Sequence, residues 1–286
     1  MNWNSYLQEY RNIRNFRPEA WITNKVKKFN NYLQKNNLTG AVLSVSGGVD
    51  SAATLALLKK TLELDNSNLK KIVALNQPIH SSDWALNRSK ELCDKFGVEL
   101  IIINQSDIHN QLVEQITSKI NTNSSKFADG QLRSYMRTPI NYYVAQLLSS
   151  QGYPSLVIGT GNMDEDGYLA YFCKAGDGVV DIQLISDLHK SEVFTIAKYL
   201  DVPQSITDAA PSADLWDNQE DEKELGFTYD FIEFFTGYYL KLSDEEKINF
   251  INNLNDDSKK EFLEFKNLCE NIHNRNKHKL NGVINL

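Results

Sequence analysis

The chain has 286 residues, 41% of them hydrophobic and 23% charged, which is enough for one large α/β domain or two small ones with a packed core. A net charge of −7 argues against an extended nucleic-acid surface, because phosphate binding leaves a basic footprint. Cys93, Cys173 and Cys269 form no C-x-x-C pair, so we expect neither disulfides nor a zinc ribbon. The sequence has neither a signal-peptide pattern nor an apolar run that could cross a membrane. We therefore expect a cytoplasmic protein without a membrane partner.

The first 200 residues alternate between helix-like and strand-like patterns. Two helices broken near Pro18 are expected between residues 5 and 36, and another over 82–96, closed by Gly97. Continuous apolar runs predict four strands, at 41–43, 71–75, 98–103 and 155–158. Such runs alternating with helices are typical of a parallel sheet covered on both faces. We therefore predict an α/β fold with a doubly wound, mostly parallel sheet.

Other segments are less regular. Residues 121–130 are expected to form a polar loop before a helix that reaches residue 148, in which Pro139 causes a kink or marks the true start. The acidic residues 211–224 are expected to form a loop that orders over a bound ligand. Helices are expected over 228–270, followed by a polar, basic tail from Asn271. Because no repeat or linker is visible, we expect a single domain over residues 1–286.

Residues 44–51, Ser-Val-Ser-Gly-Gly-Val-Asp-Ser, join the first predicted strand to a helix. A glycine turn at a helix N-terminus presents unpaired N–H groups to an anion, and the hydroxyls of Ser46 and Ser51 add donors. Asp50 would repel a phosphate unless a cation lies between them, which makes it a candidate Mg²⁺ ligand. No Walker pattern is present. The plain alternative is a serine and glycine turn before an ordinary helix.

A second polar stretch follows the strand at 155–158, and its end should meet the first glycine turn at one edge of the sheet. It holds six groups that could bind a metal or a polar ligand: Thr160, Asp164, Glu165, Lys174, Asp177 and Asp181. Glu165 could complete a metal site with Asp50. The alternative is a solvated acidic loop. Farther on, Lys190 lies at a predicted helix start, where a lysine is unfavourable unless it meets an anion, so it is either a phosphate ligand or an exposed lysine.

Together these stretches resemble the NAD synthetase family, within the N-type ATP pyrophosphatases. The resemblance covers residues 40–280 and rests on six motifs in order: S-G-G-x-D-S, G-T-x-N-x-x-E, K-x-G-D-G-x-x-D, L-x-K, P-S-A-D-L and D-E-x-x-L-G-x-T-Y. It implies ATP-dependent amidation of deamido-NAD to NAD through an acyl adenylate, with release of AMP and pyrophosphate. It also implies ammonia as the nitrogen donor, Mg²⁺ and a homodimer.

The resemblance assigns roles to individual residues. It implies ATP contacts at Ser44, Val45, Ser46, Gly47, Gly48, Val49, Asp50, Ser51, Thr160, Lys190 and Ser212. It implies Mg²⁺ ligation by Asp50 and Glu165. It implies catalytic roles for Asp50, Lys190 and Asp177, the last near the entry of ammonia. Substrate contacts are implied at Arg133, Lys174, Asp181, His278 and Lys279, with Arg137 competing for the role of Arg133 and a disordered basic end as the alternative for the tail.

Three readings of the function stay open beside this one. The same site could amidate nicotinate mononucleotide, which carries the same carboxylate. Another adenylating enzyme of the superfamily, a tRNA thiolase or an amidotransferase subunit, would favour paired cysteines or a basic face, and the chain has neither. A non-catalytic nucleotide-binding regulator is the third. Because no amidase-like domain precedes residue 40, we expect free ammonia or a separate partner to supply the nitrogen.

Overall fold

A computed structural model describes residues 1–211 and 221–285. Five parallel strands form one sheet in the order β3-β2-β1-β4-β5. The strands are β1 (Gly40–Ser44), β2 (Lys71–Asn76), β3 (Leu100–Ile102), β4 (Ser155–Gly159) and β5 (Ile182–Gln183). The predicted parallel sheet is confirmed, and the two-residue β5 is an addition that the sequence did not reveal.

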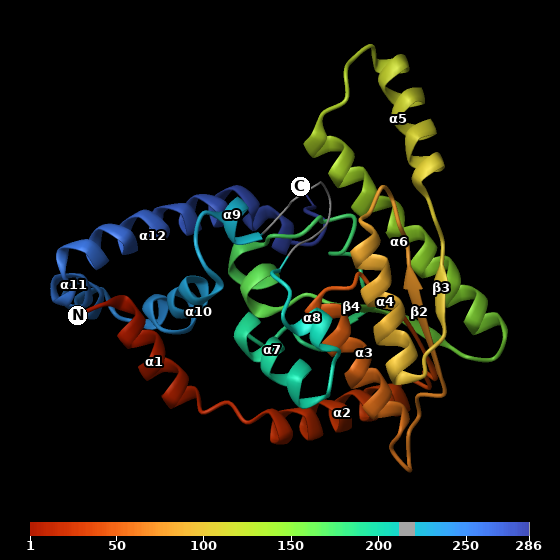
Figure 1. Ribbon diagram of the computed structural model, residues 1–286, viewed down its shortest axis with the longest axis horizontal. Coiled ribbons are helices and arrows are strands. Elements are labelled where there is room, and N and C mark those ends of the chain that lie inside the picture. Colours follow the sequence, from red (N-terminus) through yellow and green to blue (C-terminus); the bar gives the residue numbers. More distant parts are fainter. Residues whose placement is uncertain (212–220, 286) are drawn as a thin grey trace.

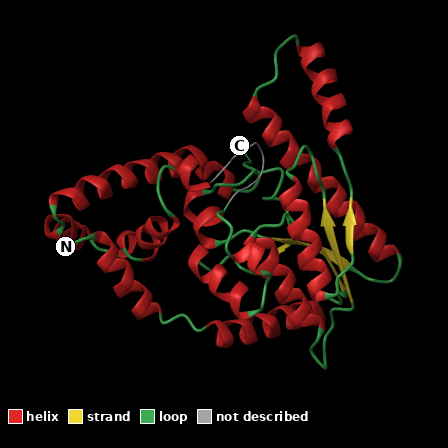
Figure 2. Cartoon of the chain, viewed as in Figure 1, coloured by secondary structure: helices red, strands yellow, loops and turns green. Residues whose placement is uncertain are grey.

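Helices make up most of the rest of the described chain (Figures 1 and 2). The α-helices are α1 (Trp3–Arg14), α2 (Pro18–Lys35), α3 (Val49–Leu62), α4 (Asp83–Phe96), α5 (Ser106–Ile120), α6 (Lys126–Ser150), α7 (Lys190–Tyr199), α8 (Gln204–Thr207), α9 (Asp221–Leu225), α10 (Tyr229–Gly237), α11 (Asp244–Asn253) and α12 (Asp256–Asn276). A π-helix, η1 (Met163–Leu169), and two 3₁₀ turns, η2 (Tyr239–Lys241) and η3 (Lys277–Leu280), complete them. No described helix is long and apolar enough to cross a membrane.

The sheet is covered on both faces, as a parallel sheet requires. Along β1, Ala41 and Leu43 pack into a core with α2, α3 and α7, whereas Val42 points to the opposite face and packs with residues of α6. This alternation follows from the two-residue period of a strand. The carboxyl ends of β1, β2 and β4 therefore open at one edge, between the two layers of helices.

A second core lies beside the sheet region and is strongly aromatic. It joins α1 to α10, α11 and α12, which lie together at the left of Figure 1. Phe231, Phe234 and Phe262 are fully buried there, and Trp3 of α1 packs edge-on against Phe231 at 5.2 Å between ring centroids. The first helix is thus attached to helices from the other end of the sequence.

In the middle of the chain the structure corrects one expectation and excludes one of two alternatives. The polar loop expected over 121–130 ends earlier, because Ser125 caps α6 by accepting a hydrogen bond from the Ala128 N–H at 3.1 Å. Pro139 lies inside α6 and is not its start. Proline removes one helical hydrogen bond, and the burial of Met136, Ala145 and Leu148 along the helix compensates for that loss.

The basic tail is helical as far as Leu280. Helix α12 continues to Asn276, and η3 follows. His273 stacks on Tyr168 of η1 with ring centroids 4.2 Å apart, and the Asn276 amide donates to the Leu169 carbonyl at 3.2 Å. The alternative of a disordered end is therefore wrong for residues 271–280. Most of the acidic segment 211–224, including Ser212, lies outside the described residues; Asp221 begins the short helix α9.

Candidate active site

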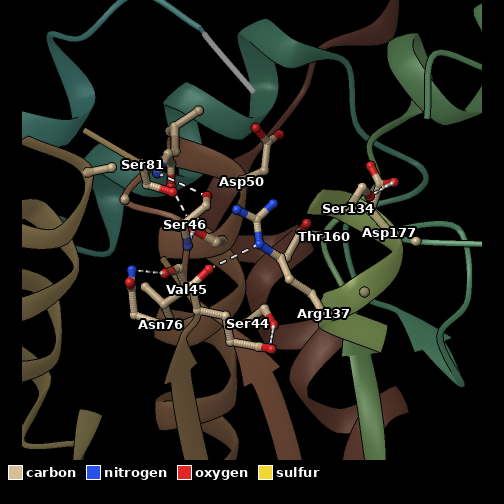
Figure 3. A pocket seen from close by; sticks show the side chains of 18 of the residues that line it. Ser44, Val45, Ser46, Asp50, Asn76, Ser81, Ser134, Arg137, Thr160 and Asp177 are labelled. Carbon is tan, nitrogen blue, oxygen red and sulfur yellow. Dashed lines mark hydrogen bonds between the residues drawn. The ribbon is translucent and has the colours of Figure 1, made fainter. Parts of the chain in front are cut away.

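A cavity of about 260 Å³ lies at the carboxyl ends of β1, β2 and β4 (Figure 3). The turn after β1 forms its floor, and all eight residues from Ser44 to Ser51 line it. Thr160 follows β4, Lys190 begins α7, and Glu165 and Asp177 complete the lining on the side of the second polar stretch. The structure thus brings together the residues predicted at two separate strand ends, as expected for an open parallel sheet.

Gly47 fixes the shape of the turn. Its φ of +85° is costly for any residue with a side chain, and a Cβ there would lie 2.5 Å from the Ala85 carbonyl oxygen of α4. Ser51 holds the turn from inside: its hydroxyl donates to the Gly48 carbonyl at 3.0 Å and accepts from the Ser46 N–H at 3.2 Å. No side chain caps α3, so its positive N-terminus faces the cavity.

Two carboxylates converge on one cation. The Lys190 ammonium donates to Asp50 Oδ2 and to Glu165 Oε1, each at 2.7 Å. The lysine is only 3% exposed. Burial alone lowers the pKa of Lys190, but the negative charges of Asp50 and Glu165 outweigh it and raise the pKa above its usual range. Lys190 is therefore a buried cation held between two carboxylates, and the alternative of an exposed lysine is wrong.

Tyr229 and Asp221 extend this cluster from the C-terminal part of the chain. The Tyr229 hydroxyl donates to Glu165 Oε1 at 2.5 Å and lies 3.1 Å from Asp221 Oδ2. Burial, followed by the charge of Glu165, raises the pKa of Asp221 to about 6. Neither side chain was given a role from the sequence. Their motif, D-E-x-x-L-G-x-T-Y, was the signal that could have identified them.

The carboxylate pair suits Mg²⁺ in its chemistry. Asp50 and Glu165 already direct one oxygen each at a common cation beside the cavity, and Mg²⁺ typically takes one or two carboxylates together with substrate phosphates and water. Across the described residues, no group of three or more histidine, cysteine or acidic side chains is arranged to hold a metal. The protein alone therefore offers an incomplete set of ligands, which a polyphosphate would have to complete.

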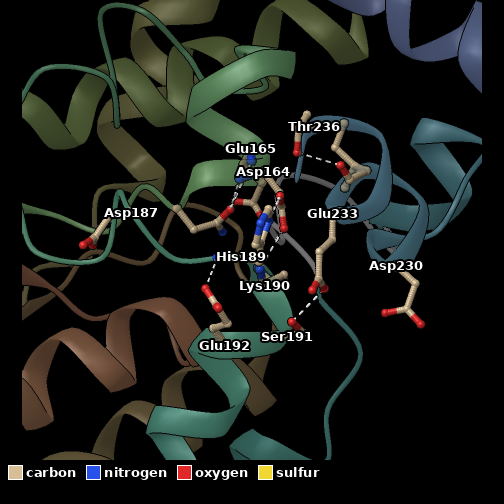
Figure 4. A network of polar contacts seen from close by, with 12 residues as sticks. Asp164, Glu165, Asp187, His189, Lys190, Ser191, Glu192, Asp230, Glu233 and Thr236 are labelled. Atoms are coloured by element: carbon tan, nitrogen blue, oxygen red, sulfur yellow. Dashed lines mark hydrogen bonds and ion pairs between the residues drawn. The ribbon is translucent and has the colours of Figure 1, made fainter. Parts of the chain in front are cut away.

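Other candidates lie elsewhere. Asp164 is fully buried and bonds to His189 and to the Lys190 N–H, so it does not face the cavity as a ligand (Figure 4). Both carboxylate oxygens of Asp181 are used in the fold, accepting from the Val157 N–H at 2.7 Å and from the Tyr142 hydroxyl at 3.2 Å. Its predicted substrate contact would have to be made beside these bonds.

Lys174, His278 and Lys279 are brought together, outside the cavity lining. The Lys174 ammonium donates to the His278 carbonyl at 3.4 Å and to the Asn281 carbonyl at 2.7 Å. Lys279 donates to the Phe172 carbonyl at 2.8 Å. The tail and the loop after η1 therefore form one basic corner.

Arg133 and Arg137 occupy different places although both belong to α6. Arg137 lines the cavity and points into it, and its Nε donates to the Gln77 carbonyl at 3.3 Å (Figure 3). Arg133 lies in a second pocket with His80 and His109. The geometry thus favours Arg137 over Arg133, the residue that the resemblance implied, for contact with a ligand in the cavity.

Asp177 lies at the edge of the cavity and keeps an exposed face. Its Oδ1 accepts from the Cys173 N–H at 2.8 Å and from the Ser134 hydroxyl at 3.2 Å. The surrounding protein displaces water from the carboxylate and raises its pKa, and the two hydrogen bonds oppose that shift. A carboxylate held by two donors at the edge of an anion site is suited to bind a small cation.

The parallel sheet, the glycine turn after β1 and the buried lysine between two carboxylates define a nucleotide-binding α/β enzyme. The chain belongs to the NAD synthase family, whose sequence model matches residues 21–282. The family makes the protein a ligase that forms a C–N bond with ATP as co-substrate.

Similar proteins agree with this assignment. The NH₃-dependent NAD⁺ synthetase of Mesoplasma florum is 33% identical over 252 residues, 88% of this chain and 90% of the relative. The NMN synthetase of Francisella tularensis has a similar structure, with a TM-score of 0.74, 30% identity and coverage of 95% of this chain and 99% of the other. The NH₃-dependent NAD synthetase of Campylobacter jejuni shares the fold, with a TM-score of 0.69, 22% identity and coverage of 95% and 100%.

Proposed function

We propose that the protein converts deamido-NAD to NAD with ATP and ammonia, releasing AMP and pyrophosphate. The observation that carries the proposal is the meeting of Asp50, Glu165 and Lys190 beside the glycine turn, in a chain similar to proteins named NH₃-dependent NAD⁺ synthetases. A carboxylate is a poor acyl donor, and an acyl adenylate replaces its oxide leaving group with a phosphate. The site would bind ATP so that its α-phosphorus is open to attack.

The first step joins two anions, so the site must neutralise charge. The amides of residues 46–51 and the positive end of α3 would bind the polyphosphate, and Lys190 would stabilise negative charge that develops as pyrophosphate leaves. Mg²⁺ held by Asp50 and Glu165 would supply further charge neutralisation to the phosphates. Arg137 would orient the substrate carboxylate from the α6 side of the cavity.

In the second step only neutral NH₃ is a nucleophile. We assign Asp177 to bind ammonium at the cavity edge and to accept its proton. The nitrogen then attacks the acyl carbon, the bond from that carbon to the AMP oxygen breaks, and AMP and a second proton leave. Ammonia would come from solution or from a separate partner. We place the rest of the dinucleotide at the basic corner formed by Lys174, His278 and Lys279.

We further propose a homodimer. Helices α5 and α6 expose several large apolar side chains, among them Ile116, Ile120, Phe127 and Tyr143. Analytical ultracentrifugation should give about twice the mass of the chain, whereas a monomer at micromolar concentration would contradict this. The single-domain organisation and the cytoplasmic location stay predictions.

Amidation of nicotinate mononucleotide is the second candidate. It is favoured by the likeness to the Francisella NMN synthetase over nearly the full length of both chains. The test offers purified protein either substrate with ATP, Mg²⁺ and ammonium, and follows AMP, pyrophosphate and the amide. A higher kcat/KM for deamido-NAD supports the proposal. Preference for the mononucleotide would replace it, and no AMP with either substrate would contradict both.

A further inference from the structure

A buried chain of hydrogen bonds connects the first helix to the catalytic lysine. The Tyr10 hydroxyl of α1 lies 2.8 Å from His189 Nε2, and His189 Nδ1 lies 2.7 Å from Asp164 Oδ1. The second oxygen of Asp164 accepts from the backbone N–H of Lys190 at 2.8 Å. Figure 4 shows Asp164 and His189 beside Lys190. Asp164 and His189 are completely buried, and Tyr10 is 7% exposed.

Hydrogen-bond chemistry limits the direction of each bond in the chain. With Asp164 ionised and the His189 ring neutral, Nδ1 donates to Asp164 and Nε2 accepts from the Tyr10 hydroxyl. Because Asp164 and His189 are completely buried, a missing partner leaves a buried polar group unsatisfied. The three side chains are therefore interdependent, and Tyr10 is the outermost member.

The chain ends on the residue that carries the buried cation. Asp164 binds the backbone of Lys190, and the next residue, Glu165, binds its ammonium at 2.7 Å. Both carboxylates belong to η1, whose first turn is capped by Asn162. Lys190 is thus held at both ends by consecutive residues of one π-helical turn, a type of element often found at functional sites.

A second contact connects α1 to the segment around His189. Arg14, one turn after Tyr10, binds Glu192 with Nη2 2.7 Å from Oε2, and Glu192 accepts from the His189 N–H at 3.0 Å. Helix α1 therefore holds both the ring and the backbone of His189. The helix lies before residue 21, where the match to the family begins.

We propose that Tyr10 and His189 are positioning residues, which act through Asp164 to hold the Lys190 ammonium between Asp50 and Glu165. This inference rests on the proposed function for its kinetic readout. It makes α1 part of the active-site support, although none of the α1 residues lines the cavity.

Tyr10→Phe tests the proposal because it removes one hydroxyl and keeps the ring. The matched control is Tyr6→Phe, one turn earlier on α1, where the hydroxyl only approaches the Met1 sulfur at 3.5 Å. We expect kcat to fall about tenfold in Tyr10→Phe, with a smaller rise in the ATP KM, because small misplacements act mainly on the transition state. Tyr6→Phe should stay within twofold of the wild type. Equal effects of the two variants would overturn the proposal.

A double-mutant cycle distinguishes positioning from general loosening of the fold. Asp164→Asn keeps an acceptor for the Lys190 N–H but changes the partner of His189. If Tyr10 acts through this chain, the kcat of the double variant should be no lower than that of the less active single variant. A kcat reduced by the product of the two single effects would contradict the proposal. The affinity for ATP, measured by calorimetry, does not depend on which substrate the enzyme adenylates. If the wild type bound ATP without turnover, the proposed function would fail, and a severalfold loss of ATP affinity in Tyr10→Phe alone would still support the positioning role.

Discussion

Asn162, in the turn after β4, donates its amide to Asp50 Oδ1 at 2.9 Å, although 112 residues separate the two in sequence. The Asn162 carbonyl oxygen accepts from the N–H groups of Asp164 and Glu165, each at 3.0 Å. One fully buried side chain thus orients both carboxylates that bind Lys190. The sheet makes this possible, because it places β1 and β4 side by side with their carboxyl ends together.

Asp50→Asn tests the role of charge in adenylation. The amide can keep the contact with Asn162 or Lys190, but it removes the negative charge that a metal ion would require. We expect pyrophosphate release to fall at least about 100-fold without loss of the fold, because the residue lies at the cavity and adds little to the core. Asp65→Asn is the control, since it makes the same charge change at an exposed position. Near-normal pyrophosphate release from Asp50→Asn would refute the metal-ligand assignment.

Glu165→Gln tests whether Glu165 binds Mg²⁺, apart from its hydrogen bonds within the site. The variant keeps a group that can accept from Tyr229 and Lys190 but is a much weaker Mg²⁺ ligand. The Mg²⁺ concentration for half-maximal activity should rise severalfold. A Mg²⁺ titration that matches the wild type would show that Glu165 does not share the ion.

Gly47→Ala tests the geometry of the turn after β1. The new Cβ would be strained by the positive φ and would also lie 2.5 Å from the Ala85 carbonyl. Gly152→Ala is the matched control, because Gly152 has φ +91° with no atom within 4 Å of the added Cβ. The strain alone should cost about 1–2 kcal/mol of the free energy of unfolding, and Gly47→Ala should cost more. Urea denaturation measures both. Equal losses would mean that the contact with α4 relaxes freely.

Arg137→Ala and Arg133→Ala decide which arginine serves the reaction. Arg137 lines the cavity and Arg133 does not, so we expect Arg137→Ala to lower kcat/KM for the dinucleotide by about 10–100-fold. Arg133→Ala should have a clearly smaller effect. The reverse order would restore the role that family resemblance assigned to Arg133.

The sequence predicts the parts of the fold whose patterns are local. The continuous apolar runs of β1, β2 and β4 and the glycines after β1 specify strand, turn and helix without knowledge of the rest. This is why every residue from 44 to 51 lies where expected. The two residues of β5 have no periodicity to detect, and the start of α6 depends on a cap at Ser125 within a segment that is polar overall.

The site is less predictable where the role of a residue depends on tertiary contacts. Asp164 and Glu165 are adjacent carboxylates in sequence, yet only Glu165 faces the cavity, because η1 turns Asp164 toward His189. Arg133 and Arg137 are one helical turn apart, so which of them reaches the cavity depends on where α6 crosses the edge of the sheet. Tyr10 is a core residue by its spacing in α1, and only the packing of that helix against α7 and α10 reveals its polar contact.

The most direct test of the central claim follows the oxygen of the substrate carboxylate. Deamido-NAD labelled with ¹⁸O in the nicotinate carboxylate is converted with ATP, Mg²⁺ and ammonium, and the products are analysed by mass spectrometry. Attack on the α-phosphorus predicts one ¹⁸O atom in AMP and none in pyrophosphate. Unlabelled AMP, or label in pyrophosphate, would contradict an acyl adenylate at this site.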